Sequence, residues 1–353
     1  MTHKVTLREV ADAAGVSVAS ASLALNNKPG VSEETRARIL RLAAELGYQQ
    51  TIRVDVTTAS AATRVACLVQ QSYGDDSMSY DYFYNQVLAG AEQITGQSEI
   101  DMTIYPFEGN ENSRFVRLYQ PINPEPFDAY MIVGTQFHYE QLADVINSGK
   151  PVVLVDSYAG DLRFNQILPD NYDGGYQAGR HLVRQGHRCI GVIGYQPGCF
   201  PGIRERYQGF QQALADNGIV HHCVEHDALF MKASRAAALR LLRRHPDITA
   251  IFALNDPAAF GVYQAAHELK LRIPDDLSII GFDDLHMAGI ISPPLTTIQI
   301  DKLLMGRIAM EHLQRQISQP DQTTITIRIH VRLIERGSVA QPDAEKSMSQ
   351  KEG

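Results

Sequence analysis

Apolar residues in the first fifty positions recur at helical spacing in three short segments. The first is predicted to be a helix over about 6–13, because Thr6 and Glu9 stand at capping-box spacing and Gly15 follows as a turn residue. Ser17 is placed to cap a second helix over about 17–25, and Ser32 a third that ends before Gly47. The apolar faces of these helices are expected at Leu7, Val10, Ala11 and Ala14, at Val18, Ala21 and Leu25, and at Ile39, Leu40, Ala43 and Leu46.

From residue 65 the pattern changes to short apolar runs that alternate with amphipathic segments. The runs are VACLVQ, IDMTIYPF, AYMIVG, PVVLVD, CIGVIG, TAIFAL and LSIIGFDD, and the helical patterns cover 173–186, 203–217, 256–270 and 301–318. Strands that alternate with helices in this way predict parallel sheets with crossover helices. About 270 residues exceed one ordinary doubly wound domain, so two lobes are expected.

The three N-terminal segments together predict a helix-turn-helix head. In that arrangement the second helix enters the major groove of DNA, where small residues permit close approach and Ser or Asn side chains can bond phosphates. Periodicity alone equally allows a plain three-helix packing unit without a ligand. Charge adds a modest argument, because residues 1–64 carry eight Lys and Arg against six Asp and Glu, although the whole chain has a net charge of −8.

The stretch VTLREVADAAGVSVASASLALNNKPGVSEETRARILRLAAELGY resembles the DNA-binding head of the lac repressor family of transcription regulators. The resemblance implies a DNA-binding role for residues at matching positions. These are Thr6, Leu7, Ser17, Ser20, Ser22, Asn26 and Ser32 toward phosphates or groove edges, and Val18, Ala19 and Leu23 at base-reading positions. Members of the family often have polar or aromatic residues where this chain has Val18 and Ala19, so apolar contacts with thymine methyl groups are expected instead.

The segment after Tyr48 departs from the family pattern. The family usually shows Pro-Asn and then a hinge helix with a Leu that enters the minor groove, whereas this chain has QQTIRVDVTTASAATRV with Thr57 at the Leu position. β-Branched residues lower the helix propensity here. Two interpretations stay open: Val56 or Val54 acts as the minor-groove wedge, or 49–64 is a flexible linker.

The remaining chain resembles the effector-binding domain of the same family, whose fold is shared with periplasmic sugar-binding proteins. The motifs are YDGGYQAGRHLVRQGHRCIGVIG, RERYQGFQQAL, ALNDPAAFG, IIGFDD and SPPLTTI. The expected fold is thus an all-α helix-turn-helix head (1–48), a hinge (49–64) and a two-lobed α/β periplasmic-binding-protein-like domain with parallel sheets (65–338). The N-terminal lobe is expected at 65–160 and 290–322, the C-terminal lobe at 161–289 and 323–338, and a disordered tail at 339–353.

The same resemblance implies an effector cleft between the lobes, at the carboxyl ends of the strands. Asp173, Arg206, Asn255 and Asp283 match ligand-contacting positions, and their carboxylate, guanidinium and amide groups suit a polyhydroxylated ligand. Aromatic stacking is expected from Tyr73 and Phe230, each of which can equally be a packing residue. Asp173 can also be a helix N-cap, and Asp256 and Asp284 are expected to be a cap and a loop contact.

Other chemistry finds little support in the sequence. GVIGYQPG lacks a phosphate-loop pattern, His181 and His187 lack metal-site spacing, and the four cysteines lack a C-x-x-C pair, so neither a metal nor a cofactor is expected. A membrane span and a signal peptide are also unsupported, which predicts a cytoplasmic protein.

The sequence therefore predicts a DNA-binding transcription regulator, with repression the favoured sense, and not an enzyme. Its expected partners are double-stranded operator DNA of near-palindromic sequence, a sugar or sugar derivative as effector, and a second copy in a homodimer. The alternatives are an α/β enzyme or a solute-binding protein for a sugar or nucleoside. The identity of the effector, and whether it releases or promotes DNA binding, stay open.

Overall fold

The computed structural model divides the chain into two compact units, residues 1–61 and 62–353. The structure describes residues 7–17, 20–21, 24, 31–32, 35, 38–39, 41–43, 62–71, 77–108, 117–118, 126–134, 145, 147–158, 164–220, 222–226, 229–320 and 323–342. Except for 62–64, the predicted hinge lies outside these residues. Across this described part of the chain, helices are too short or too polar to cross a membrane.

The head begins with the predicted helix, α1 (Leu7–Ala14), and a turn at Gly15. Gly15 has φ +63°, a left-handed conformation that glycine adopts without steric cost, and its N–H bonds the carbonyl of Asp12. Among the described residues, the predicted apolar positions of the three helices are buried, as their spacing leads us to expect. The described core of the head consists of Val10, Ala11, Ala14, Ala21, Ala24, Ile39 and Ala43.

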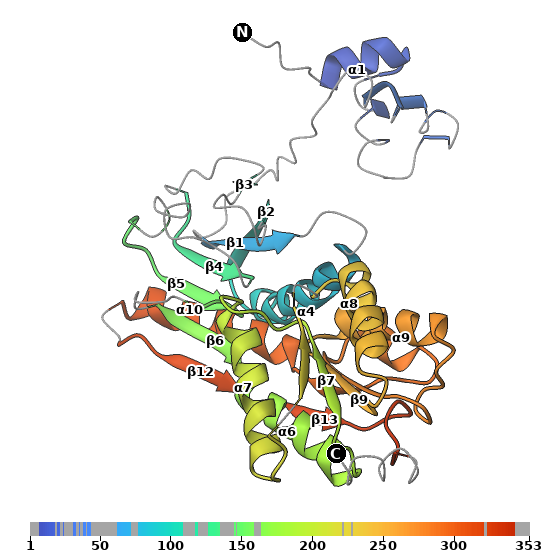
Figure 1. The fold of residues 1–353 in the computed structure, drawn as a ribbon. Coiled ribbons are helices and arrows are strands. Elements are labelled where there is room, and N and C mark those ends of the chain that lie inside the picture. Colours follow the sequence, from blue (N-terminus) through green and yellow to red (C-terminus); the bar gives the residue numbers. More distant parts are fainter. Residues whose placement is uncertain are drawn as a thin grey trace. The chain divides into compact units, whose positions relative to one another are not determined.

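The N-terminal lobe of the larger unit is a seven-stranded sheet in the order β12-β6-β5-β4-β1-β2-β3. Its strands are β1 (Thr63–Gln71), β2 (Ile100–Glu108), β3 (Arg117–Leu118), β4 (Ala129–Val133), β5 (Val152–Val155), β6 (Asn165–Pro169) and β12 (Thr326–Ile329). Helices α4 (Ser77–Thr95) and α10 (Lys302–Ser318) pack on each other and against the central strands (Figure 1). Side chains of β1 alternate between two clusters, since Val65 and Cys67 face these helices and Ala66 and Leu68 face away.

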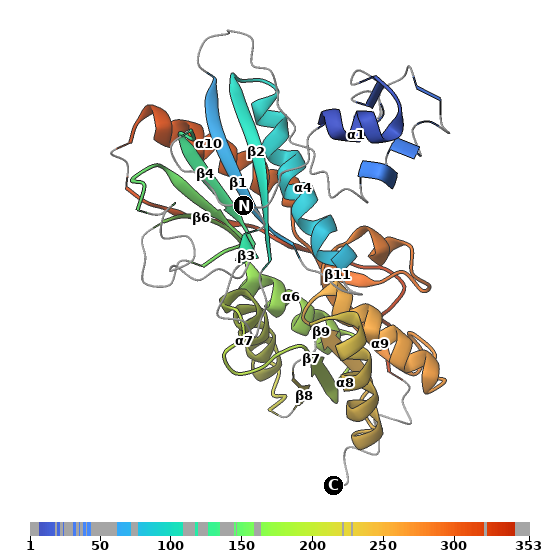
Figure 2. The same cartoon turned by 90° about the horizontal axis from the view of Figure 1, so that it is seen from above.

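The C-terminal lobe is a six-stranded sheet in the order β13-β11-β10-β9-β7-β8. Its strands are β7 (Ile190–Ile193), β8 (Cys223–Glu225), β9 (Ala250–Ala253), β10 (Ser278–Asp283), β11 (Thr296–Gln299) and β13 (Arg332–Ile334). Figures 1 and 2 show α6 (Asn171–Arg184) and α7 (Pro201–Ala215) on one face, and α8 (Met231–Arg244) and α9 (Asp256–Glu268) on the other. Most adjacent strands in both sheets run parallel, as predicted. The antiparallel strand pairs are β2–β3 and β11–β13.

The predicted boundaries between the lobes are wrong in three places. β6 was assigned to the C-terminal lobe but pairs with β5, and β12, assigned likewise, pairs with β6. β11 was assigned to the N-terminal lobe but pairs with β10. The chain thus passes between the sheets after β6, after β11 and after β12. An apolar run predicts a strand but carries no information on which sheet will accept its hydrogen bonds.

The predicted disordered tail begins too early. Ser338 is fully buried, and Ala340 accepts a hydrogen bond from His187 Nε2 at 2.9 Å and donates to Ser278 Oγ at 3.1 Å. Residues 339–342 therefore belong to the C-terminal lobe, because side chains from two distant segments bond their backbone. Residues 343–353 lie outside the described part.

Helices α6 and α7 cross at two glycines. A Cβ atom on Gly175 would lie 1.9 Å from the carbonyl oxygen of Arg206, and a Cβ on Gly209 would lie 1.9 Å from that of Tyr172. Any side chain at either position would force the helix backbones apart. The absence of Cβ atoms at this crossing thus fixes the position of Arg206.

Candidate functional site

The described part of the head contains the two serines predicted to cap helices. Ser17 Oγ accepts a hydrogen bond from the backbone N–H of Ser20 at 3.0 Å, and Ser32 Oγ accepts from that of Thr35 at 3.3 Å. Both capping predictions are confirmed, and both serine side chains are exposed. Contacts with DNA stay predictions for Ser17, Ser20 and Ser32. For Leu7 the structure describes only the backbone, at the start of α1. The other predicted DNA-binding residues lie outside the described residues: Thr6, Val18, Ala19, Ser22, Leu23, Asn26 and Val56.

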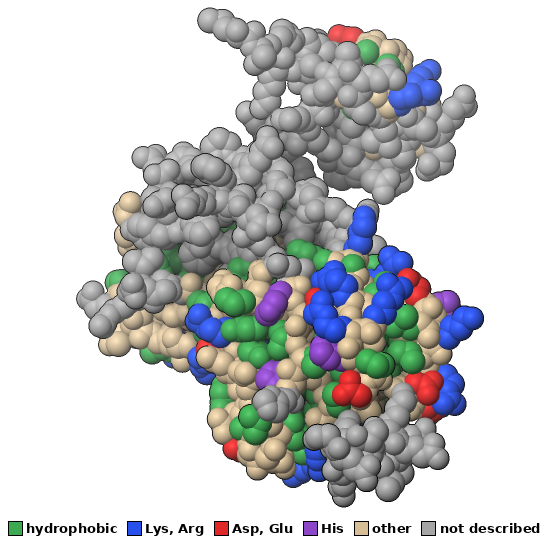
Figure 3. Space-filling view, in the orientation of Figure 1, with side chains coloured by type: hydrophobic (Ala, Val, Ile, Leu, Met, Phe, Trp, Pro, Cys, Tyr) green, Lys and Arg blue, Asp and Glu red, His purple; other side chains and the backbone are tan. Residues whose placement is uncertain are grey.

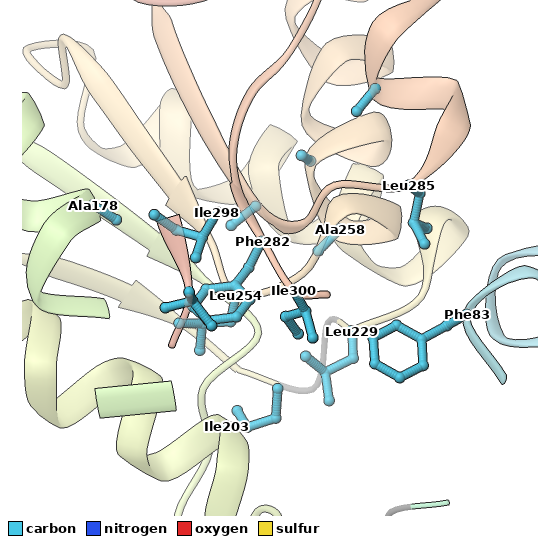
Figure 4. Close-up of a cluster of buried hydrophobic side chains, with 14 of the residues drawn as sticks. Phe83, Ala178, Ile203, Leu229, Leu254, Ala258, Phe282, Leu285, Ile298 and Ile300 are labelled. Atoms are coloured by element: carbon cyan, nitrogen blue, oxygen red, sulfur yellow. The ribbon is translucent and has the colours of Figure 1, made fainter. Parts of the chain in front are cut away.

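A cavity of about 50 Å³ lies between the two lobes of the larger unit. Figure 4 shows Phe83 of α4, from the N-terminal lobe, near Leu229 and Ile203 of the C-terminal lobe. The cavity is lined by both polar and apolar side chains. The lining residues are Phe83, Tyr84, Asp156, Phe200, Ile203, Arg206, Leu229, Asn255, Pro257, Asp283 and Leu285. Three residues that the sequence resemblance placed in an effector cleft, Arg206, Asn255 and Asp283, are thus brought together.

Arg206 is held from three sides. Its Nε donates to Asn171 Oδ1 at 2.8 Å, its Nη1 to the carbonyl of Leu254 at 2.7 Å, and its Nη2 lies 3.1 Å from Asp283 Oδ1. The guanidinium also lies over the ring of Phe282, with Cζ 3.8 Å from the ring centre. With a side chain only 7% exposed, Arg206 is a fixed element of the cavity wall.

Asn255 and Asp283 stand at the carboxyl ends of neighbouring strands. Asn255 follows β9 and caps α9, because its Oδ1 accepts from the N–H of Ala258 at 2.8 Å. Its Nδ2 is a further donor, and the residue lines the cavity. Asp283 ends β10 with φ +109°, an unusual conformation for a residue with a side chain. Burial raises the pKa of Asp283, against the opposing charges of Arg206 and Lys302.

Asp156 is a cavity residue that the sequence prediction missed. It follows β5, is 6% exposed, and the structure records no hydrogen-bond partner for its carboxylate among the described residues. Burial raises its pKa to about 7; the charge of Arg206 opposes the shift and that of Asp283 adds to it. The signal was present, because PVVLVD ends in a carboxylate in the same way that IIGFDD does.

The raised pKa of Asp156 predicts a pH-dependent stability. An aspartate in the unfolded chain titrates near pH 4, so between about pH 4 and 7 the folded protein retains a proton that the unfolded chain releases, and stability falls as pH rises. Asp156→Asn is expected to make the free energy of unfolding fall by up to about 3 kcal/mol less over this pH range. Urea unfolding of both proteins from pH 5 to pH 8 measures it, and parallel pH profiles would contradict the burial of an ionisable Asp156.

Two further buried ionisable side chains bond to the backbone of residues that line the cavity. Asp256 accepts from the N–H of Leu285 at 2.7 Å and from Thr297 Oγ1 at 2.6 Å, and burial raises its pKa to about 8. It is therefore not the predicted cap, a role that Asn255 has. The ammonium of Lys302 donates to the carbonyls of Asp283, Asp284 and Ile300. The predicted loop contact of Asp284 is confirmed, with Arg336 Nη2 2.7 Å from its carboxylate.

Two other predicted effector residues, Asp173 and Phe230, do not line the cavity. Asp173 is in the first turn of α6, where its Oδ2 accepts from Gln177 Nε2 at 2.6 Å, and the cap of this helix is Asp170 rather than Asp173. Phe230 begins α8, and its neighbour Leu229 lines the cavity in its place. Tyr73 lies outside the described residues. An effector role for these three stays a prediction.

Metal and thiol chemistry is not suggested by the described residues. They contain no group of His, Cys, Asp and Glu with the geometry of a metal site, and all four cysteines are free. His187 is buried between Thr249 and Ala340, and burial lowers its pKa to about 4.

Family models match both units of the chain. Residues 6–50 match the bacterial regulatory proteins of the lacI family, and residues 180–339 match the periplasmic binding protein-like domain. The chain is a lac repressor family regulator. Its fold class, a helix-turn-helix head with a two-lobed α/β domain, is the one predicted from the sequence.

Similar proteins extend the match over nearly the whole chain. The ribose operon repressor of Haemophilus influenzae is 28% identical over 95% of this chain and 98% of its own length. The HTH-type transcriptional repressor PurR of Aliivibrio fischeri is 26% identical over the same shares. These lac repressor family relatives are transcriptional repressors, so this chain is a DNA-binding transcription regulator and not an enzyme.

Solved structures share the fold. The transcriptional regulator CelR in complex with cellobiose superimposes with a TM-score of 0.66, at 24% identity, over 95% of this chain and all of that one. A LacI family transcriptional regulator from Enterococcus faecium with bound ribose has a TM-score of 0.66 and 24% identity, over 79% of this chain and 99% of its own.

Proposed function

We propose that this regulator binds a near-palindromic operator as a homodimer and that a small polyhydroxylated effector in the interlobe cleft controls its affinity for DNA. The main support for an effector site is that Asp156, Arg206, Asn255 and Asp283 line the same cavity between the two lobes. A ligand held there contacts both lobes, so it can favour one arrangement of them over another.

The hydrogen-bonding groups of the cavity favour hydroxyl-rich ligands. Asp156 and the second oxygen of Asp283 are acceptors, and Asn255 Nδ2 is a donor. Arg206 already pairs with Asp283, and the ammonium of Lys302 is bonded to backbone carbonyls. Neither cation of this region is thus available to pair with a phosphate. The complexes of CelR with cellobiose and of the Enterococcus faecium regulator with ribose support an uncharged sugar.

Cavity size indicates that the cleft must widen for such a ligand. Small-molecule sites enclose roughly 300–1,000 Å³, whereas the cavity holds about 50 Å³. A sugar can therefore be held there only if the walls of the cavity move.

The DNA part of the proposal rests on the head. Its described core, its two capped helices and its lacI-family match support a helix-turn-helix that contacts one half-site. Two half-sites in a near-palindrome require two heads, for which a homodimer is the simplest source.

Fluorescence anisotropy with DNA from upstream of its own gene tests the proposal. The intact protein is expected to bind one site tightly, with an affinity that falls as salt rises and that one sugar of a panel changes. A protein lacking residues 1–61 is expected to lose DNA binding and to retain sugar binding. DNA binding that survives this deletion would contradict the role of the head, and a full sugar panel without effect would contradict the effector cleft.

A further inference from the structure

The guanidinium of Arg206 is oriented by both stacking and hydrogen bonds. Stacking on Phe282, with Cζ 3.8 Å from the ring centre, sets its plane but leaves rotation within that plane free. Two acceptors prevent this rotation: Asn171 Oδ1 accepts from Nε at 2.8 Å, and the carbonyl of Leu254 accepts from Nη1 at 2.7 Å. The direction of the remaining N–H groups therefore depends on where Asn171 presents its oxygen.

Asn171 could present either its oxygen or its NH₂ group, because the two ends of a side-chain amide have nearly the same shape. It begins α6 and is fully buried, so the end that faces away from Arg206 needs a partner from the protein. Tyr158 is this partner, since Asn171 Nδ2 donates to its hydroxyl oxygen at 3.2 Å. A Cβ on Gly202 would lie 2.9 Å from Nδ2, so the bare backbone at the start of α7 leaves room for the contact.

The hydroxyl of Tyr158 has one proton, which it donates to Glu205 Oε2 at 2.8 Å. Burial and the charge of Glu205 raise the pKa of Tyr158, so the phenol keeps this proton at neutral pH. Arg328 bonds the two carboxylate oxygens of Glu205 at 2.9 and 3.0 Å and holds them in place as acceptors. The oxygen of Tyr158 is left to accept, and only Nδ2 of Asn171 can donate to it. An acceptor at one end of this chain and a guanidinium at the other thus allow one orientation of the amide.

We propose that Asn171 and Tyr158 are positioning residues that aim the remaining N–H groups of Arg206 at one hydroxyl of the effector and so decide which sugars bind. This inference rests on the effector cleft proposed above. Arg206 lines the cavity, whereas Asn171 and Tyr158 are not among its described lining residues, so both act through Arg206. Nε uses its single N–H on Asn171 and Nη1 uses one of two on Leu254, so the donors left lie on Nη1 and Nη2.

A donor in a fixed direction discriminates between ligands better than a mobile one. A site that hydrogen-bonds one ligand hydroxyl rejects the analogue without this group, because the buried donor is then left unpaired. A guanidinium that can rotate finds another acceptor, and the penalty falls. Loss of positioning should therefore weaken binding of the complete sugar and leave binding of the deoxy analogue nearly unchanged. General damage to the fold would weaken both alike.

Tyr158→Phe is the first test variant, because it keeps the aromatic ring and removes the hydroxyl that accepts from Asn171. Asn171→Ala, which removes the acceptor of the Arg206 Nε proton, is the second. Tyr176→Phe is the matched control, since Tyr176 also donates to a carboxylate, Asp216 Oδ2 at 3.0 Å, and no hydrogen bond recorded for the described residues links this pair to Arg206. All substitutions are made in the full-length chain.

Hydrogen exchange of the Arg206 Nε proton is measured first, without ligand, by NMR of protein with isotope-labelled arginine. Arg206→Lys identifies the resonance. This buried proton is expected to exchange slowly in the parent and in Tyr176→Phe, and about tenfold faster in Tyr158→Phe. In Asn171→Ala it should be faster still. Equal exchange in the parent and in both test variants would overturn the positioning, whatever sugars do.

Titration with ribose, glucose and cellobiose, and with monodeoxy analogues of each sugar that binds, then tests the link to the effector. For at least one analogue, the ratio of its dissociation constant to that of the complete sugar is expected to fall about tenfold in Tyr158→Phe and to stay unchanged in Tyr176→Phe. Ratios that stay unchanged in Tyr158→Phe for every analogue would overturn the role in effector selection.

The two measurements separate this inference from the proposed function. If the parent protein binds none of these sugars, nor any of a full panel, the proposed sugar effector fails, and the selection of sugars by Arg206 fails with it. The exchange rates would still decide whether Asn171 and Tyr158 position Arg206, because they are measured without ligand.

Discussion

Arg206→Ala is expected to abolish the effector response while DNA binding persists. The substitution removes the donors that fix Asn171, the Leu254 carbonyl and Asp283, so the cavity wall loses its organising group. It also removes the ion-pair partner of the buried Asp283, which should lower the free energy of unfolding by about 3–5 kcal/mol. Operator anisotropy with and without sugar, together with urea unfolding, measures both effects.

The double variant Arg206→Ala, Asp283→Ala separates the two effects. Stability is expected to recover in large part, because no unpaired buried charge remains, whereas the effector response stays absent. Arg240→Ala is the control: Arg240 is 54% exposed and pairs with Glu225 on the surface, so less than about 1 kcal/mol should be lost. A normal sugar response in Arg206→Ala would contradict the cleft assignment.

Gly175→Ala is expected to cost about 3 kcal/mol of stability and to weaken effector binding. The new Cβ would lie 1.9 Å from the carbonyl oxygen of Arg206, a backbone atom that cannot rotate away. Helices α6 and α7 must then separate, and α7 carries Arg206 with it. Urea unfolding and sugar titration of the same protein measure the two consequences.

Gly289→Ala provides the comparison for this prediction. A Cβ on Gly289 would meet no atom within 4 Å, so neither stability nor binding should change by a measurable amount. Equal stability of Gly175→Ala and Gly289→Ala would show that the α6–α7 crossing tolerates a side chain.

Surface charge illustrates how location decides the role of a cation. Figure 3 shows Lys and Arg side chains gathered over α8, where Arg240 and Arg244 pair with Glu225 and remain largely exposed. Arg206 has the same guanidinium but is buried between Phe282 and Asp283. The amino-acid composition does not distinguish these arginines. Their surroundings in the fold do, because Arg240 and Arg244 are exposed to solvent whereas Arg206 is buried in the wall of the cavity.

The sequence by itself determined the local elements and part of the site. Helical spacing located α1 and the caps Ser17 and Ser32, because burial of one helix face gives a periodic pattern. The predicted apolar runs located β1, β2, β4, β5, β7, β9 and β10, whereas the shorter or more polar strands β3, β6, β8, β12 and β13 were not among them, and neither was β11. Arg206, Asn255 and Asp283 came from motifs that resemble a known family, and the structure brings them to one cavity.

Tertiary structure alone decided which segments meet. β6, β11 and β12 each pair in the lobe opposite to the predicted one, because the partner of a strand is set by the packing of the whole fold and not by its own sequence. Glu205 and Arg328 are separated by 123 residues, and no local pattern records their contact. Contacts between distant segments depend on the packing of the whole fold, whereas sequence periodicity reports only whether a side chain is buried.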